Sequence, residues 1–231
     1  MEQFLRDGLT ALGLNPEAAP ALERYGQMLL KRNQVMNLTA ITDPADVAAL
    51  HFLDSAALLT VADFRGASVA DVGTGAGFPG LPLRILEPGI QLTLLDAQKK
   101  RVDFLREVCA DLKLEDVECV HGRAEEFAAE RRESFDRVVS RAVANLRLLS
   151  ELCLPLVKVG GLFLAMKSVD SGEELAGAGN AIAALGGAVE GTADYAIPGT
   201  EVRHRVILIR KTRKTEEMYP RAFAKIKKHP L

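Results

Sequence analysis

The sequence has few cysteines, and their spacing excludes two common uses of this residue. Its 231 residues include three, Cys109, Cys119 and Cys153, and none stands in the C-x-x-C spacing of a zinc ribbon. An odd number of cysteines without that spacing indicates neither a disulfide framework nor a metal site. We expect Cys109, which falls on an apolar helical stripe, to belong to the core.

Long apolar runs and a leader segment are also missing. No run approaches the ~20 apolar residues that cross a bilayer, and Met1 to Asp7 lack a basic region followed by an apolar one. Hydrophobic residues make up 48% and charged residues 26%, which is ordinary for a soluble globular protein. We therefore expect one principal core in a cytoplasmic protein without a membrane partner.

The net charge of −2 conceals an asymmetry along the chain. Residues 203–231 carry +8, whereas residues 1–202 carry −10. A basic segment of this kind attracts polyphosphates such as nucleic acids. The alternative is a solvated tail that binds nothing in particular.

A glycine-dense stretch from Val69 to Gly80 predicts a buried strand that turns sharply into a helix. The G-x-G-x-x-G fingerprint of dinucleotide-binding proteins is absent, because its third glycine falls on Phe78. The pattern present is Asp71-x-Gly73-x-Gly75-x-Gly77, which resembles the first motif of class I S-adenosylmethionine-dependent methyltransferases. A turn with a purely structural role is the alternative.

The remaining patterns predict an α/β fold. Asn15-Pro16 and Asp43-Pro44 mark helix starts in a helical extension over residues 1–62. Strands are expected at 69–72, 91–95, 117–120, 137–140, 162–166, 188–195 and 205–209. Helices are expected at 81–86, 98–112, 124–130, 145–157 and 173–185. Residues 63–231 thus predict a doubly wound, seven-stranded, mostly parallel sheet of the Rossmann-like kind.

Ligands of such sheets bind beyond the carboxyl ends of the strands, which nominates particular residues. Asp96 ends the second strand 23 residues after Gly73, where an acid accepts hydrogen bonds from both ribose hydroxyls. The segment His121 to Glu125 follows the third strand and suits an adenine edge. Arg141 follows the fourth, where it would bind the cofactor carboxylate or an RNA phosphate, or else form a salt bridge with a neighbouring acid.

His51 and Asp54 lie on the apolar side of the third predicted helix. Buried polar side chains need hydrogen bonds, so we expect these two to bond to each other or to the loop they cover. A satisfied structural pair is favoured over a catalytic one.

Several segments together resemble one enzyme family. They are Asn37-Leu38-Thr39-Ala40-Ile41, His51-Phe52-Leu53-Asp54-Ser55, the stretch from Asp71 to Gly80, Lys100-Arg101 before Phe104-Leu105, Ser140-Arg141-Ala142, Tyr219-Pro220-Arg221 and Lys227-Lys228-His229-Pro230-Leu231. In this order they are similar to the bacterial small-subunit ribosomal RNA guanine-N7 methyltransferases of the RsmG (GidB) family. The resemblance implies methylation of one guanine in 16S ribosomal RNA, position 527 in the usual rRNA numbering, with S-adenosyl-L-methionine as cofactor.

The glycine motif and the strand-end acid, together with this resemblance, define the expected cofactor contacts. These are Asp71, Gly73, Thr74, Gly75, Gly77, Phe78, Asp96, Ala97, Ala124, Glu125 and Arg141. Two departures from the family pattern concern the RNA side. Lys167 is followed by Ser168 where Lys-Gly is expected, and Ala222-Phe223 replaces a basic residue and a small one.

Two signatures of other nucleic-acid methyltransferases are absent. There is no Pro-Cys dipeptide for attack on cytosine C5, and no Asp/Asn-Pro-Pro-aromatic run for exocyclic amines follows the fourth strand. Guanine N7 has a lone pair and no proton, so a positioning mechanism without a catalytic base or metal suffices, with Arg141 as an orienter.

The RNA substrate predicts a further set of basic contacts. They are Arg123, Lys167, Arg203, Arg221, Lys225, Lys227 and Lys228. We expect a monomer whose partner is 16S ribosomal RNA, within the 30S subunit or an assembly intermediate. A methyltransferase for a small molecule or a protein, and a non-catalytic RNA-binding module, are the alternatives.

Overall fold

The computed structural model describes residues 1–141 and 144–231, so the motif residue Ala142 lies outside the described residues. The strands are β1 Ser68–Val72, β2 Gln91–Asp96, β3 Val117–His121, β4 Phe135–Arg141, β5 Val157–Ser168, β6 Gly187–Ala196 and β7 Arg203–Lys211. The helices are α1 Glu2–Ala11, η1 Pro16–Ala18, α2 Ala19–Met36, α3 Pro44–Val47, η2 Ala48–Leu53, α4 Asp54–Ala56, α5 Leu58–Val61, α6 Gly80–Leu86, α7 Lys99–Asp111, α8 Ala124–Glu130, α9 Leu146–Cys153, η3 Leu154–Leu156, α10 Gly172–Ala184 and α11 Phe223–Lys228.

The seven strands form one sheet in the order β3-β2-β1-β4-β5-β7-β6. Strands β1 to β5 pair in parallel, whereas β7 runs antiparallel to both β5 and β6. This confirms the predicted doubly wound, mostly parallel sheet. The register places Arg141 beside Met166, and Ser168 beside His204. The start of β7 therefore joins the carboxyl ends of β4 and β5 at one edge of the sheet.

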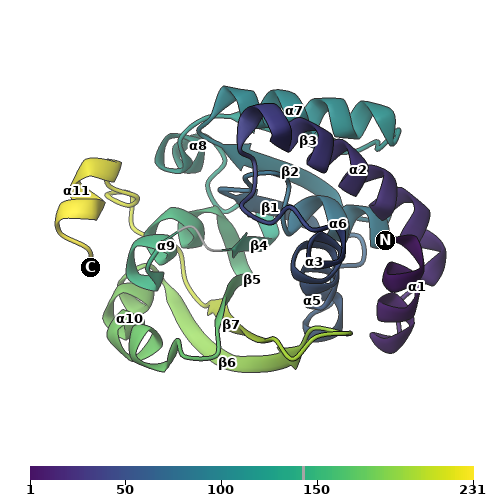
Figure 1. Cartoon of the computed structure of the whole chain (residues 1–231). Helices are drawn as coiled ribbons and strands as arrows, with labels where there is room; N and C mark the ends of the chain where they lie inside the picture. Colours follow the sequence, from purple (N-terminus) through teal and green to yellow (C-terminus); the bar gives the residue numbers. More distant parts are fainter. Residues whose placement is uncertain (142–143) are drawn as a thin grey trace.

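Hydrophobic residues fill both faces of the sheet. One core joins the N-terminal helices to α6, α7 and the sheet, and the other joins α8, α9, α10 and the C-terminal segment to the opposite face. In Figure 1 α1, α2 and α3 lie on the right of the sheet, whereas α9, α10 and α11 lie on the left. The first core makes the helical extension continuous with the sheet that it covers.

Both predicted proline-preceding caps are present in the N-terminal helices. The Asn15 side chain accepts a hydrogen bond from the Glu17 N–H, and that of Asp43 accepts from the N–H groups of Ala45 and Asp46. Each cap satisfies a backbone donor that the first helical turn leaves unpaired.

The helical stretch Pro44–Val61, formed by α3, η2, α4 and α5, corrects the expectation that no segment approaches membrane-spanning length. Its 18 residues have a mean hydropathy of 1.2, long and apolar enough by length and composition, and 56% of the stretch is buried inside the protein. The sequence pattern concealed it because His51 and Asp54 interrupt the apolar residues. Phe52 and Leu53 are fully buried in the first core, which makes this a core helix.

The helix predicted over 145–157 is shorter than expected. Helix α9 ends at Cys153, a single 3₁₀ turn follows, and Val157 is already the first residue of β5. Pro155 is the physical reason, since it lacks the N–H donor that an α-helix would pair with the carbonyl four residues earlier.

Candidate active site

Asp71 holds the turn after β1 from inside the protein. Its Oδ2 accepts hydrogen bonds from the Thr74 hydroxyl at 2.7 Å and from the Gly80 N–H at 2.8 Å. The side chain is fully buried, and burial raises its pKa to about 6. Asp71 and Thr74 therefore stabilise the turn from the protein interior, and neither lines the cavity described below.

The glycine turn faces two environments. Gly73 and Gly75 have φ angles of 71° and 61°, and a Cβ added to Gly75 would meet open space. Gly77, with φ of 105°, points the other way, where a Cβ would collide with the Tyr25 hydroxyl. Phe78 stacks on Tyr25 with ring centroids 5.4 Å apart. One side of the turn is open to a ligand and the other contacts the N-terminal helices.

Asp96, at the end of β2, is bonded directly to the glycine turn. Its carboxylate accepts hydrogen bonds from the N–H groups of Gly75 at 3.0 Å and Gln98 at 2.8 Å. The Arg101 guanidinium lies 3.4 Å from the same carboxylate. The structure thus joins the two features whose sequence spacing predicted a shared site.

A cavity of about 360 Å³, here called the cofactor cavity, opens at the carboxyl ends of β1, β2, β3 and β4. Its walls are formed by Val72, Gly73, Leu95, Asp96, Ala97, Gln98, Arg101, Gly122, Arg123, Ala124, Glu125, Arg141, Leu152 and Phe223. Six predicted cofactor contacts are among these residues, namely Gly73, Asp96, Ala97, Ala124, Glu125 and Arg141. They come from four separate strand ends that the fold brings together.

A second cavity of about 520 Å³ lies against the other side of Arg141. It is lined by Ile41, Leu50, His51, Asp54, Arg141, Met166, Lys167, Ser168, Val202 and His204. Arg141 is the side chain that the two cavities share.

The Arg141 guanidinium is held on several sides by the helical stretch Pro44–Val61. Its NH1 donates to the Leu50 carbonyl and to the Asp54 carboxylate, both at 2.9 Å, and its NH2 lies 3.0 Å from Nδ1 of His51. The guanidinium also sits over the Phe78 ring, 5.1 Å from its centroid. The salt bridge considered from the sequence is therefore present, and it fixes Arg141 between the cavities.

His51 and Asp54 bond to Arg141 rather than to each other. Burial, followed by the Arg141 charge, lowers the pKa of His51 to about 4, so the ring is neutral near pH 7. Because Nδ1 accepts from Arg141, Nε2 carries the proton and donates to the Thr39 hydroxyl at 2.8 Å. Thr39 belongs to the segment Asn37 to Ile41, so two of the sequence motifs meet at this histidine.

Asp54 accepts hydrogen bonds from three side chains that lie far from it in the sequence. Besides Arg141 it accepts from the Tyr195 hydroxyl at 2.7 Å, and its carboxylate lies 2.7 Å from Nδ1 of His204. Burial alone raises the pKa of Asp54, but the hydrogen bond to His204 and the Arg141 charge outweigh it, so the pKa lies below its usual value. The same hydrogen bond raises the pKa of His204. Asp54 is therefore a buried carboxylate with a charged arginine beside it.

Comparison with known proteins gives a family for this arrangement. The model of the family GidB, described as rRNA small subunit methyltransferase G, matches residues 18–205. The chain belongs to the GidB family. A "Ribosomal RNA small subunit methyltransferase G" of Alkaliphilus oremlandii is 46% identical over 100% of this chain and 99% of its own length. One from Geobacillus thermodenitrificans is 44% identical over 95% and 94%.

Solved structures share the fold of this GidB-family chain. A SAM-dependent methyltransferase from Aquifex aeolicus superposes with a TM-score of 0.54 at 18% identity, covering 75% of this chain and 96% of its own. TrmN from Thermus thermophilus gives a TM-score of 0.54 at 24% identity, covering 68% of this chain and 48% of its own. These likenesses confirm the Rossmann-like fold.

The cofactor cavity of this GidB-family member suits S-adenosylmethionine. Gly73 lines the cavity, the neighbouring Gly75 leaves open space at the same turn, and Asp96 presents a carboxylate that accepts two backbone hydrogen bonds. Leu95 and Leu152 add apolar walls, and Arg141 adds a positive charge. Bare glycine backbone allows the ligand to approach closely. The acid suits the ribose of an amino-acid nucleoside, the apolar surface suits its base, and the cation suits its carboxylate.

The predicted RNA contacts of the GidB-family chain lie in different settings. Arg123, Arg203, Lys225, Lys227 and Lys228 are exposed. Arg221 instead pairs with the buried Glu151 at 2.6 Å, and Lys167 lines the second cavity, where it donates to Glu174 at 2.7 Å. The structure therefore separates freely accessible cations from two that are already paired.

Sequence reasoning missed several residues of the cavity wall. Gln98 and Arg101 follow Asp96 by two and five residues, and their position just after the strand end was a usable signal. Leu152 and Phe223 had no such signal, because α9 and the basic tail are distant in sequence from the glycine turn.

Proposed function

We propose that this chain transfers the methyl group of S-adenosylmethionine to N7 of one guanine in 16S ribosomal RNA. The observation that carries the proposal is the pair of cavities separated by Arg141, one suited to the cofactor and one to a base. Membership of the GidB family supports the same reaction, since the relatives bear the name of a small-subunit ribosomal RNA methyltransferase.

The chemistry requires binding and orientation rather than proton transfer. When bound, S-adenosylmethionine supplies an electrophilic methyl group on a sulfonium sulfur. Guanine N7 offers a lone pair without a proton, so the chain needs no general base. Asp96 and Arg141 would fix the two ends of the cofactor, and orientation of this kind lowers a barrier by ~7–11 kcal/mol.

We assign the guanine to the second cavity. Ile41, Leu50 and Met166 offer apolar surface to the faces of a base, and Lys167 and His204 offer donors to its O6 or to a neighbouring phosphate. On this view residues 1–62 complete the substrate side, and residues 63–231 form the methyltransferase domain. Bases splayed out of single-stranded loops are the usual targets of such pockets.

The RNA contacts outside the cavities are assigned by charge. The exposed Arg123, Arg203 and the lysines of α11 are the phosphate contacts we propose, because RNA affinity is largely electrostatic. We further propose that the protein acts as a cytoplasmic monomer on the 30S subunit or an assembly intermediate.

The test is nucleoside analysis of 16S ribosomal RNA from cells that lack the protein, with the restored gene as control. We expect 7-methylguanosine to disappear from one position and to return on restoration. Unchanged 7-methylguanosine refutes the assignment. Incubation of purified protein with labelled cofactor and either naked 16S RNA or 30S subunits then identifies the substrate form, and transfer that ignores RNA would indicate a different acceptor.

A further inference from the structure

Phe223, in the short helix α11, contributes its side chain to the cofactor cavity. The other notable side chains of the tail are basic and are expected to contact RNA. Phe223 instead places an aromatic ring in the wall of the cofactor cavity.

The ring lies at one particular end of the cavity. The Arg123 guanidinium is 5.8 Å from the Phe223 ring centroid, and Gly122, Ala124 and Glu125 form the adjoining wall. This end follows β3, where the segment His121 to Glu125 is expected to hold an adenine edge. Aromatic side chains stack on the faces of bases and strengthen their binding.

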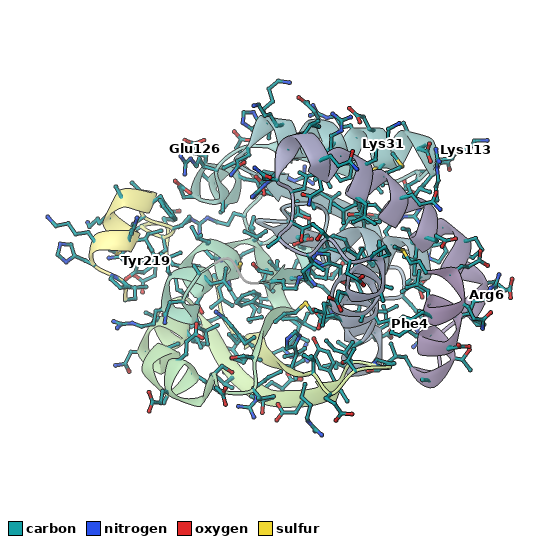
Figure 2. The ribbon with its side chains drawn as sticks, in the orientation of Figure 1. Phe4, Arg6, Lys31, Lys113, Glu126 and Tyr219 are labelled. Atoms are coloured by element: carbon teal, nitrogen blue, oxygen red, sulfur yellow. The ribbon has the colours of Figure 1, made fainter. Side chains whose placement is uncertain are left out.

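Polar contacts fasten the C-terminal segment, residues 219–231, against the body of the protein. Arg221 donates to the Glu151 carboxylate from its backbone N–H at 2.9 Å, its Nε at 2.8 Å and its NH2 at 2.6 Å. Glu151 is fully buried. Arg132 donates to the Tyr219 carbonyl, and Arg147 to the Leu231 carbonyl. Figure 2 shows Tyr219 where this segment meets the body.

The same helix faces three ways. Ile226 is fully buried in the second core, Phe223 lines the cofactor cavity, and Lys225, Lys227 and Lys228 are exposed. Because α11 has only six residues, its aromatic, apolar and basic side chains share one short helix.

We propose that Phe223 contacts the adenine of the cofactor, and that the docked tail thereby couples cofactor binding to RNA binding. A filled cavity holds Phe223, and with it α11, in the docked position. The exposed lysines are then already placed for RNA, so each ligand tightens the other by the same factor. The coupling rests on the proposed function, whereas the Phe223 contact does not.

Calorimetry with S-adenosylhomocysteine, without RNA, tests the contact. We expect Phe223→Ala to weaken binding about tenfold, and Phe223→Tyr, which keeps the ring, to stay within twofold. Glu151→Gln weakens the ion pair that docks the tail but does not change the Phe223 side chain itself. This variant should also bind S-adenosylhomocysteine more weakly. Thermal melting without cofactor reports folding in each variant. Folded Phe223→Ala with wild-type affinity overturns the proposal.

RNA binding in the presence and absence of S-adenosylhomocysteine tests the coupling. We expect the compound to tighten wild-type binding of a 16S RNA fragment about fivefold, and Phe223→Ala to reduce that factor to about one. The triple variant Lys225→Ala, Lys227→Ala, Lys228→Ala should lose RNA affinity but keep its affinity for the compound. Lys31→Ala, an exposed lysine of α2 labelled in Figure 2, is the matched control.

The outcomes separate this inference from the proposed function. An RNA affinity that ignores S-adenosylhomocysteine in the wild-type protein overturns the coupling. If the wild-type protein transfers no methyl group to ribosomal RNA, but Phe223→Ala still weakens S-adenosylhomocysteine binding, the proposed function is overturned and the cofactor contact stands.

Discussion

The cofactor cavity and the second cavity share Arg141 but are assembled in different ways. The cofactor cavity takes most of its walls from residues at or directly after the carboxyl ends of β1, β2 and β3. The second cavity combines the N-terminal helices with the ends of β5 and β7, and its polar centre is the carboxylate of Asp54. The first is a product of the sheet, whereas the second exists because the helical extension closes over the sheet edge.

The difference shows how the two cavities depend on long-range packing. Asp96 reaches its partner Gly75 across 21 positions of sequence, within adjacent strand and turn elements. Asp54 reaches Tyr195 across 141 positions and His204 across 150. Substitutions in the shared wall should therefore affect both cavities, and substitutions elsewhere should affect one.

Arg141→Ala should have the largest effect, because it removes the wall that the cavities share. Asp54 is 1% exposed, and a buried carboxylate that loses its ion-pair partner costs about 3–5 kcal/mol of stability. In folded protein at low temperature, single-turnover methyl transfer should fall at least about 100-fold, the penalty of lost orientation. Urea unfolding and rapid-quench assays measure the two effects.

A surface pair provides the control for that substitution. Arg65 bonds Asp63 at 2.9 Å, but the two side chains are 79% and 56% exposed. Arg65→Ala should therefore cost less than about 1 kcal/mol. Similar losses in Arg65→Ala and Arg141→Ala would contradict the role given to burial.

Asp96→Ala should damage the cofactor cavity alone. It removes a carboxylate that accepts two backbone hydrogen bonds and that we propose to bind the cofactor ribose, so S-adenosylhomocysteine affinity should fall about 100-fold. Affinity for RNA without cofactor should stay within twofold. Asp111→Ala, which removes an exposed carboxylate of α7 paired with Arg24, is the control in calorimetry. Near-normal affinity in Asp96→Ala would remove this acid from the site.

The same contrast explains what the sequence predicts about this protein. The strands, the glycine turn and Asp96 follow from local patterns, and the structure confirms the strands and the doubly wound sheet. The partners of His51 and Asp54 do not follow, because Arg141 lies 90 and 87 positions away from them. The sequence assigns Phe223 only to the RNA-binding tail, and its position in the cofactor cavity does not follow, because the tail is distant in sequence from the strand ends. Contacts between residues that are far apart in the sequence have no characteristic spacing from which they could be predicted.

His204→Gln should give the smallest effect, and one that depends on pH. The hydrogen bond to Asp54 raises the pKa of His204 above its unfolded value, so its stabilisation is complete below about pH 6.5 and disappears as pH rises through the folded pKa. Gln keeps a donor but does not titrate. The wild-type protein should therefore exceed His204→Gln in stability at pH 6 by about 0.5–1 kcal/mol, the range of partly exposed pairs, and by less at pH 8.5. Urea unfolding at both pH values measures this, and a difference that is constant or grows with pH would show that Asp54 draws its stabilising charge from Arg141 alone.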